Sequence, residues 1–186
     1  MWCNIGYAAL ISYYNLKLQD NITDHFTPEQ INQFYMNDVR YVTNYKGEKL
    51  LGRDLKYSMI SIKEEDKKIF IEDFPSIIIQ IYYENKTDKI VSISQSRKVT
   101  DFNNCLLTRE KEVNKYKKKK RIKSFFEKFE GKETRPDGVV DHSISFQGPI
   151  KYLNFKCEVH TTGVVVFRKE IGEWTFGDFI FEKIRK

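Results

Sequence analysis

The chain has 186 residues, of which 40% are hydrophobic and 15% are aromatic. This length and composition exclude a largely disordered protein and fit one folded domain with a sizeable core. The formal net charge is +6, and one run alone carries six positive charges with no acid among them. The run consists of Lys117, Lys118, Lys119, Lys120, Arg121 and Lys123. The basic character is therefore local and does not describe the whole surface.

The first 36 residues predict helices. Residues 1–18 carry apolar side chains at helical spacing. A second helix is predicted from residue 27 to residue 36, because Thr27 can cap it, Pro28 suits its first turn and Gln30 completes a capping box. The apolar stretch at residues 5–14 is too short to span a membrane and lacks the flanks of a signal peptide. We therefore expect either a cytoplasmic protein or one whose targeting segment is missing, with membrane proximity through the N-terminus as an option.

From residue 39 the apolar period becomes that of strands. Strands are predicted at residues 39–45, 55–60, 68–72, 77–83 and 89–95, with turns at residues 46–47 and 84–88. The run at residues 77–83 is almost continuously apolar, which is typical of a strand covered on both faces. We expect it at the centre of a sheet.

A long central helix is predicted at residues 104–130 by length, composition and the lack of breakers. Its apolar residues change face, since Leu106 and Val113 lie roughly opposite Ile122 and Phe126 at about 100° per residue. Either two helices meet near the lysine run, or one helix crosses from one packing surface to another. Residues 131–138 predict an exposed loop.

The last third predicts strands again, at residues 153–159, 164–167 and 174–176. Turns are expected at residues 161–163 and 172–173, and a bulge at Gly177. The predicted fold class is α+β: a mostly antiparallel twisted sheet with N-terminal helices and one long central helix. We expect a single domain over residues 1–186, with the helical segment 1–36 packed on the sheet.

Two cysteines decide the compartment. Cys105 opens the predicted central helix, and Cys157 lies on the apolar side of an alternating strand. A disulfide between them would join helix to sheet and place the protein outside the reducing cytosol. The alternative is a pair of buried reduced thiols, because spacing alone does not establish a bond. Cys3 is expected to be free.

No catalytic or metal-binding motif stands out. His25, His142 and His160 lack a partner at metal-ligand spacing. The acids Asp137 and Asp141 are expected on a solvated polar loop, and no glycine-rich phosphate loop occurs. We therefore expect no enzyme, no cofactor and no metal.

The basic run permits several roles. It could grip a phosphate backbone, but no recognition motif accompanies it, so we expect no nucleic acid as a partner. A solvated helix face is the usual meaning of such a run. An acidic protein surface is an equally compatible partner, because concentrated charge accelerates encounter and selects partners.

One larger pattern resembles a known family. A strand pair is followed by Asp101-Phe102-Asn103-Asn104-Cys105-Leu106, then by Phe155-Lys156-Cys157-Glu158-Val159 and an aromatic end near Trp174. This is similar to small extracytoplasmic immunity proteins that protect bacteria from secreted antibacterial toxins. The resemblance implies a non-enzymatic inhibitor in the periplasm or cell envelope that occludes the active site of a cognate toxin.

The surfaces expected to bind such a partner are the basic run together with Tyr152, Lys156 and Trp174. The competing interpretation is a cone-shaped protein of the nuclear-transport-factor type, which binds or converts a small molecule inside a curved sheet. A third is a structural surface protein. The oligomeric state and the identity of the toxin stay open.

Overall fold

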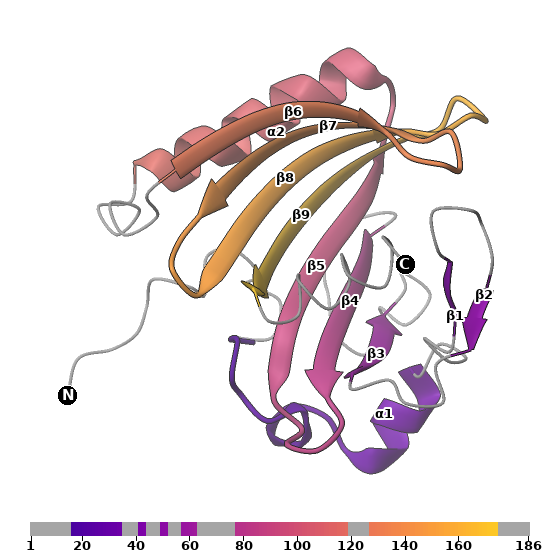
Figure 1. The fold of residues 1–186 in the computed structure, drawn as a ribbon, viewed down its shortest axis with the longest axis vertical. Helices are drawn as coiled ribbons and strands as arrows, with labels where there is room; N and C mark the ends of the chain where they lie inside the picture. The colour runs from indigo at the N-terminus through magenta and orange to yellow at the C-terminus, as the bar shows by residue number, and fades with distance from the viewer. Residues whose placement is uncertain are drawn as a thin grey trace.

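The computed structural model describes residues 16–34, 41–43, 49–51, 57–62, 77–118 and 127–174. Its main feature is a seven-stranded antiparallel sheet with the strand order β3-β4-β5-β9-β8-β7-β6 (Figure 1). The strands are β3 (Tyr57–Ile62), β4 (Ile77–Glu84), β5 (Ile90–Val99), β6 (Glu127–Thr134), β7 (Val140–Gln147), β8 (Lys151–Val159) and β9 (Val165–Glu173). Two short strands, β1 (Tyr41–Thr43) and β2 (Lys49–Leu51), pair separately. The predicted α+β class with an antiparallel sheet is confirmed.

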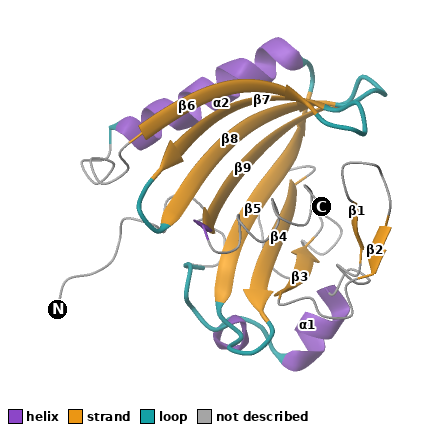
Figure 2. Cartoon of the chain, viewed as in Figure 1, coloured by secondary structure: helices purple, strands orange, loops and turns teal. Residues whose placement is uncertain are grey.

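Helical elements lie at two ends of the sheet. The 3-10 turn η1 (Ile22–Asp24) and helix α1 (Pro28–Phe34) lie near β3 to β5, whereas α2 (Phe102–Lys117) lies at the other end and packs mainly on β8 and β9 (Figures 1 and 2). The predicted capping box is confirmed, because Thr27 N donates to Gln30 Oε1 over 2.9 Å and Gln30 N donates to Thr27 Oγ1 over 3.3 Å. Asp101 caps α2 by accepting a 2.8 Å bond from Asn104 N.

The sheet has one apolar face and one polar face. Side chains alternate along each strand, so the residues that share a face with Cys157 form the core beneath α2 and the N-terminal segment. We call this the helix face; it carries Ile81, Ile93, Ile144, Phe146, Leu153, Phe155, Phe167 and Ile171, all buried. The opposite side, the polar face, carries one polar residue from each of six strands in register: Ser61, Gln80, Ser94, Glu170, Asn154 and Ser145.

The expected disulfide is confirmed. Cys105 of α2 and Cys157 of β8 are bonded with an S–S distance of 2.12 Å and a Cα–Cα distance of 5.8 Å, and neither is accessible to solvent. Cys3 lies outside the described residues.

The central helix is shorter than predicted. It ends at Lys117, and residues 127–130, which we expected to be helical, begin strand β6. Residues 131–134, expected in a loop, continue that strand. The reason is tertiary: every residue from Glu127 to Thr134 has a pairing partner in β7, and this ladder outweighs local helix propensity. The change of apolar face in the sequence was the signal of this break.

Three further expectations differ from the structure. Strand β4 is second from the end of the sheet, and its Ile78 is 41% exposed, so it is not a central strand covered on both faces. Residues 172–173, expected to turn, belong to β9. Residues 16–18 are not helical, and the rest of the predicted helix 1–18 lies outside the described residues. The turn at residues 46–47, the strand at 68–72 and the bulge at Gly177 also lie outside them.

Candidate functional site

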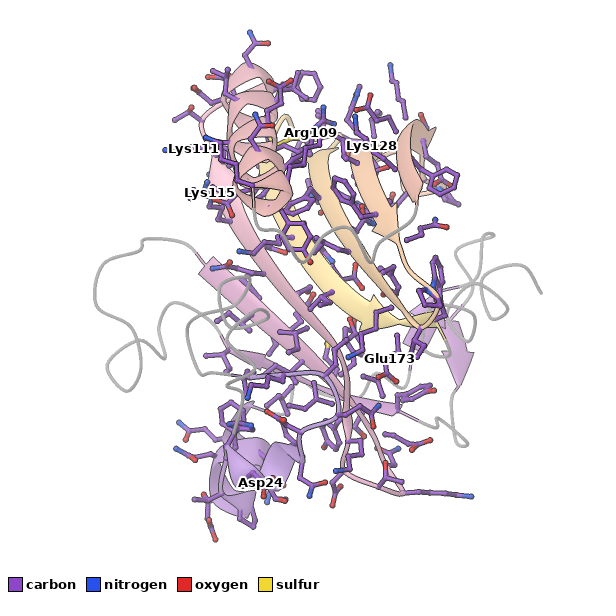
Figure 3. All side chains as sticks on the ribbon, turned by 90° about the vertical axis from the view of Figure 1, so that its left-hand side faces the viewer. Asp24, Arg109, Lys111, Lys115, Lys128 and Glu173 are labelled. Carbon is purple, nitrogen blue, oxygen red and sulfur yellow. A yellow bond between two sulfur atoms is a disulfide. The ribbon has the colours of Figure 1, made fainter. Side chains whose placement is uncertain are left out.

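Cations from α2 and from the edge strand β6 meet at one end of the sheet. We name Arg109, Lys117, Lys128 and Lys132 the α2–β6 cluster. Lys128, Glu130 and Lys132 alternate along β6 and point to the helix face, because their partners in β7 are Phe146, Ile144 and His142. Figure 3 shows Arg109 of α2 and Lys128 of β6 at the same end of the molecule.

The pKa values of two neighbouring groups, Glu130 and His142, are shifted by this concentration of positive charge. The Lys128 ammonium donates a hydrogen bond to Glu130 and, together with the charges of Arg109 and Lys117, lowers the pKa of Glu130. The pKa of His142 is also lowered, by burial and then by the charges of Lys132 and Arg109, against a smaller opposing effect of Asp141. The cluster therefore holds one carboxylate ionised and keeps the nearby imidazole neutral.

Arg109 is fixed in place by the sheet. Its Nη1 donates a 3.1 Å bond to the carbonyl oxygen of His142, and its Nε is buried with no hydrogen-bond partner. The ring of Phe102 lies against the His142 ring, with 4.6 Å between centroids. The guanidinium is thus oriented by its surroundings, and it keeps capacity for a further acceptor.

The other side of α2 is held by an ion pair between a buried lysine and a half-buried glutamate. Lys169 of β9 points to the helix face, and its Nζ lies 3.7 Å from Glu112 Oε2, while Lys115 Nζ donates to Glu112 Oε1 over 2.7 Å. Burial lowers the pKa of Lys169, and Glu112 opposes this. Together with the disulfide and the buried Val113 and Tyr116, this pair fixes α2 on the sheet.

On the polar face, the Glu170 carboxylate accepts hydrogen bonds from side chains of two neighbouring strands. Glu170 Oε1 accepts a 2.7 Å bond from the Tyr152 hydroxyl and a 3.2 Å bond from Ser92 Oγ. Burial raises the pKa of Tyr152, and burial, assisted by the Glu170 charge, raises the pKa of Tyr82 to about 12. Both phenols are therefore neutral hydrogen-bonding groups at physiological pH, and neither has the lowered pKa expected of an activated nucleophile.

Gly172 makes room for Tyr152. A Cβ on Gly172 would lie 2.5 Å from the Tyr152 hydroxyl oxygen and 2.6 Å from its ring carbon Cζ. We expect Gly172→Ala to lower the free energy of unfolding by about 1–3 kcal/mol, because the ring must move away from Glu170. Urea denaturation measures this. Gly131→Ala is the matched control, since its Cβ would meet only Ser143 Oγ at 3.7 Å; an equal loss in both variants would contradict the steric argument.

An ionic network lies at the end of the polar face where the β6–β7 and β8–β9 hairpins project (Figure 2). Asp141 and Glu158 are direct cross-strand neighbours, with exposed fractions of only 4% and 2%. Arg168 Nε lies 3.0 Å from Glu158 Oε1, and Lys156 Nζ lies 3.4 Å from Asp141 Oδ2. Arg135 bridges the two acids at 3.5 Å and 3.9 Å. The expectation that Asp141 is solvated is therefore wrong, whereas Asp137 is exposed.

The predicted partner-binding residues that the structure describes lie on more than one surface. Lys117 and Lys118 are exposed at the end of α2. Tyr152 and Trp174 contact each other with 5.3 Å between ring centroids, and Tyr152 shares the polar face with Lys156. Trp174 Nε1 also donates to the carbonyl oxygen of Gly148 over 2.7 Å. Lys119, Lys120, Arg121 and Lys123 lie outside the described residues.

Sequence reasoning missed Arg109, Lys128 and Lys132. None of them has a cation as its immediate neighbour in the sequence, so no basic run marked them. The alternation of Lys128, Glu130 and Lys132 was an available signal, since period two places all three on one side of a strand.

No family model, curated protein or solved structure matches the chain. Within the described ranges, no three His, Cys, Asp or Glu side chains gather as metal ligands would. The helices described here are also too short or too polar to cross a membrane.

Proposed function

We propose that this protein is a non-enzymatic inhibitor that binds an acidic protein partner through the α2–β6 cluster. The observation that carries the proposal is a cationic cluster formed by an edge strand of the sheet and by a helix that a disulfide joins to the same sheet. A surface held in one arrangement loses little conformational entropy on binding, so more of the contact energy appears as affinity. Fixed charges also steer an acidic partner and exclude basic ones.

The immunity-protein resemblance gives this proposal a specific form. In that form the partner is a secreted antibacterial toxin, and the acidic surface borders its active site. A buried disulfide supports action outside the cytosol, in the periplasm or cell envelope, because such bonds persist in oxidising compartments. Tyr152, Lys156 and Trp174 remain proposed as additional contacts, for a partner large enough to reach the polar face.

The test starts from the purified chain as bait in extracts of the producing organism after nuclease treatment. We expect a protein to be retained, and its affinity, measured with the purified partner, to fall as salt rises. Retention of a nuclease-sensitive polymer instead would favour nucleic acid. Turnover of a small molecule, with no protein retained, would favour the cone-shaped enzyme.

Charge reversal in β6 provides the quantitative check. We expect the double variant Lys128→Glu and Lys132→Glu to bind the purified partner at least about tenfold more weakly at low salt, because two favourable contacts become repulsive. Isothermal titration measures this. Lys86→Glu is the control for the single variant Lys132→Glu, because both change the net charge by the same amount and Lys86 is an exposed lysine in the β4–β5 loop, remote from α2 and β6. Equal losses at both places would mean that only net charge matters.

A further inference from the structure

Strand β6 is the last strand of the described sheet, and its free edge is exposed. All residues from Lys128 to Thr134 are exposed to solvent. An uncovered edge is a template for another strand, which is why proteins usually shorten, cover or charge it. This edge is eight residues long, so it can accept a segment of similar length.

The hairpin geometry identifies the backbone groups that face outward. Arg135 N donates to the carbonyl oxygen of Val139 over 2.8 Å, so Arg135 and Val139 form a hydrogen-bonded pair. In an antiparallel ladder such pairs alternate with non-hydrogen-bonded ones. The non-hydrogen-bonded positions, whose N–H and C=O groups point away from β7, are therefore Lys128, Glu130, Lys132 and Thr134. No residue of the described ranges bonds to these outward groups.

The same outward-facing residues carry the charges that would select a guest strand. Lys128 and Lys132 flank Glu130 on the helix face, next to Arg109 and Lys117. Directly opposite side chains in a strand pair interact, and opposite charges there are favourable. A guest with carboxylates opposite the two lysines and an uncharged residue opposite Glu130 therefore matches this edge. A guest with the reverse pattern is repelled.

We propose that β6 receives an extended acidic segment of the partner as an additional antiparallel strand. Its backbone bonds to the outward groups of β6, and its carboxylates lie over the α2–β6 cluster. This mode is β-augmentation, in which main-chain bonds give affinity and alternate side chains give specificity. The proposal rests on the proposed function, because it names the part of the partner that the cluster binds.

The probe is an eight-residue peptide with glutamate at its third and seventh positions, opposite Lys132 and Lys128 in an antiparallel alignment with β6, and threonine elsewhere. It is compared with the peptide that carries lysine at the same two positions. We expect the glutamate peptide, but not the lysine peptide, to shift the amide resonances of Lys128, Glu130, Lys132 and Thr134. The same peptide should slow the hydrogen exchange of these four amides. The amides of Phe129, Gly131 and Glu133, which face β7, are internal controls and should change little. Slowed exchange at higher protein concentration without peptide would show pairing with a second copy and overturn the proposal.

Two variants at one position separate backbone pairing from charge. Glu130→Pro removes one outward N–H and one repelling carboxylate, and proline is tolerated at an edge position whose N–H faces solvent. We expect at least about fivefold weaker peptide binding for Glu130→Pro, and unchanged or tighter binding for Glu130→Gln. Retained protection of the inward amides confirms that the proline variant is folded.

The outcomes distinguish the two proposals. If the peptide shifts only the resonances of lysine side chains, and if Glu130→Pro still binds it tightly, strand addition is wrong. The proposed binding of an acidic partner by the α2–β6 cluster would still hold. A purified partner that binds without any effect on the β6 amides would lead to the same conclusion. Absence of any protein partner would remove the proposed function as well.

Discussion

Loss of the Cys105–Cys157 bond is expected to lower the free energy of unfolding by about 4 kcal/mol. The two cysteines are 52 residues apart, and closing a loop of that length removes about this much entropy from the unfolded chain. The bond is also a main attachment of α2, since only Cys105, Val113 and Tyr116 of that helix are buried. Without it, the helix is held mainly by Tyr116 against Phe146 and Phe155 and by the Lys169–Glu112 pair.

The measurement is urea denaturation of the double variant Cys105→Ala and Cys157→Ala, beside the oxidised and reduced forms of the native chain. Cys3→Ser is the matched control, because it removes a cysteine but leaves the Cys105–Cys157 bond intact. We also expect weaker partner binding by the double variant, since Arg109 and Lys117 lose their fixed position. A double variant as stable as the control would show that α2 is held by packing alone.

The parts of the fold that sequence predicted are those with strong local patterns. Cys157 could be placed inward because Leu153, Phe155 and Val159 alternate with polar residues. The start of α1 could be placed because Thr27, Pro28 and Gln30 form a local hydrogen-bonding unit. Both depend on neighbours within a few residues, which is the information that a sequence window contains.

Strand β6 could not be predicted in this way. The segment from Glu127 to Thr134 is rich in Glu and Lys and carries Gly131, so its local preference is not that of a strand. Its conformation is imposed by pairing with β7 and by the turn at Gly138, whose φ is +80°. Because β6 was expected to be helix and loop, the side of the sheet that Lys128 and Lys132 share with Arg109 could not be inferred either.

Of the four residues in the α2–β6 cluster, only Lys117 was predicted from the sequence. The lysine run drew attention to the end of α2, and Lys117 does belong to the cluster. The buried pair Asp141 and Glu158 was hidden for a different reason: their burial depends on Arg135, Lys156 and Arg168 from three separate segments. Such long-range neutralisation leaves no trace in residue spacing.

Alkaline pH is expected to destabilise the fold through Tyr82. Its pKa is raised from 10.0 to about 12, mainly by burial and then by the Glu170 charge. The unfolded chain therefore loses this proton near pH 10, while the folded chain keeps it until about pH 12. The contribution is fully present below pH 10 and is lost between pH 10 and 12, by about 2–3 kcal/mol. Tyr152 acts in the same direction, because its pKa is also raised.

Lys169 acts in the opposite direction, so the native curve alone does not isolate the tyrosine. Burial lowers the pKa of Lys169 below 10.5, so the folded chain loses this proton at a lower pH than the unfolded chain does. The free energy of unfolding therefore rises with pH until the unfolded chain also loses the proton near pH 10.5. The measurement is therefore the difference between the native chain and Tyr82→Phe in urea denaturation at several pH values from 8 to 12. We expect Tyr82→Phe to lose less stability above pH 10 than the native chain does. We also expect the folded variant to lack the rise in tyrosinate absorbance near pH 12 that the native chain shows. Parallel curves for the two proteins would show that Tyr82 ionises alike in the folded and unfolded chains.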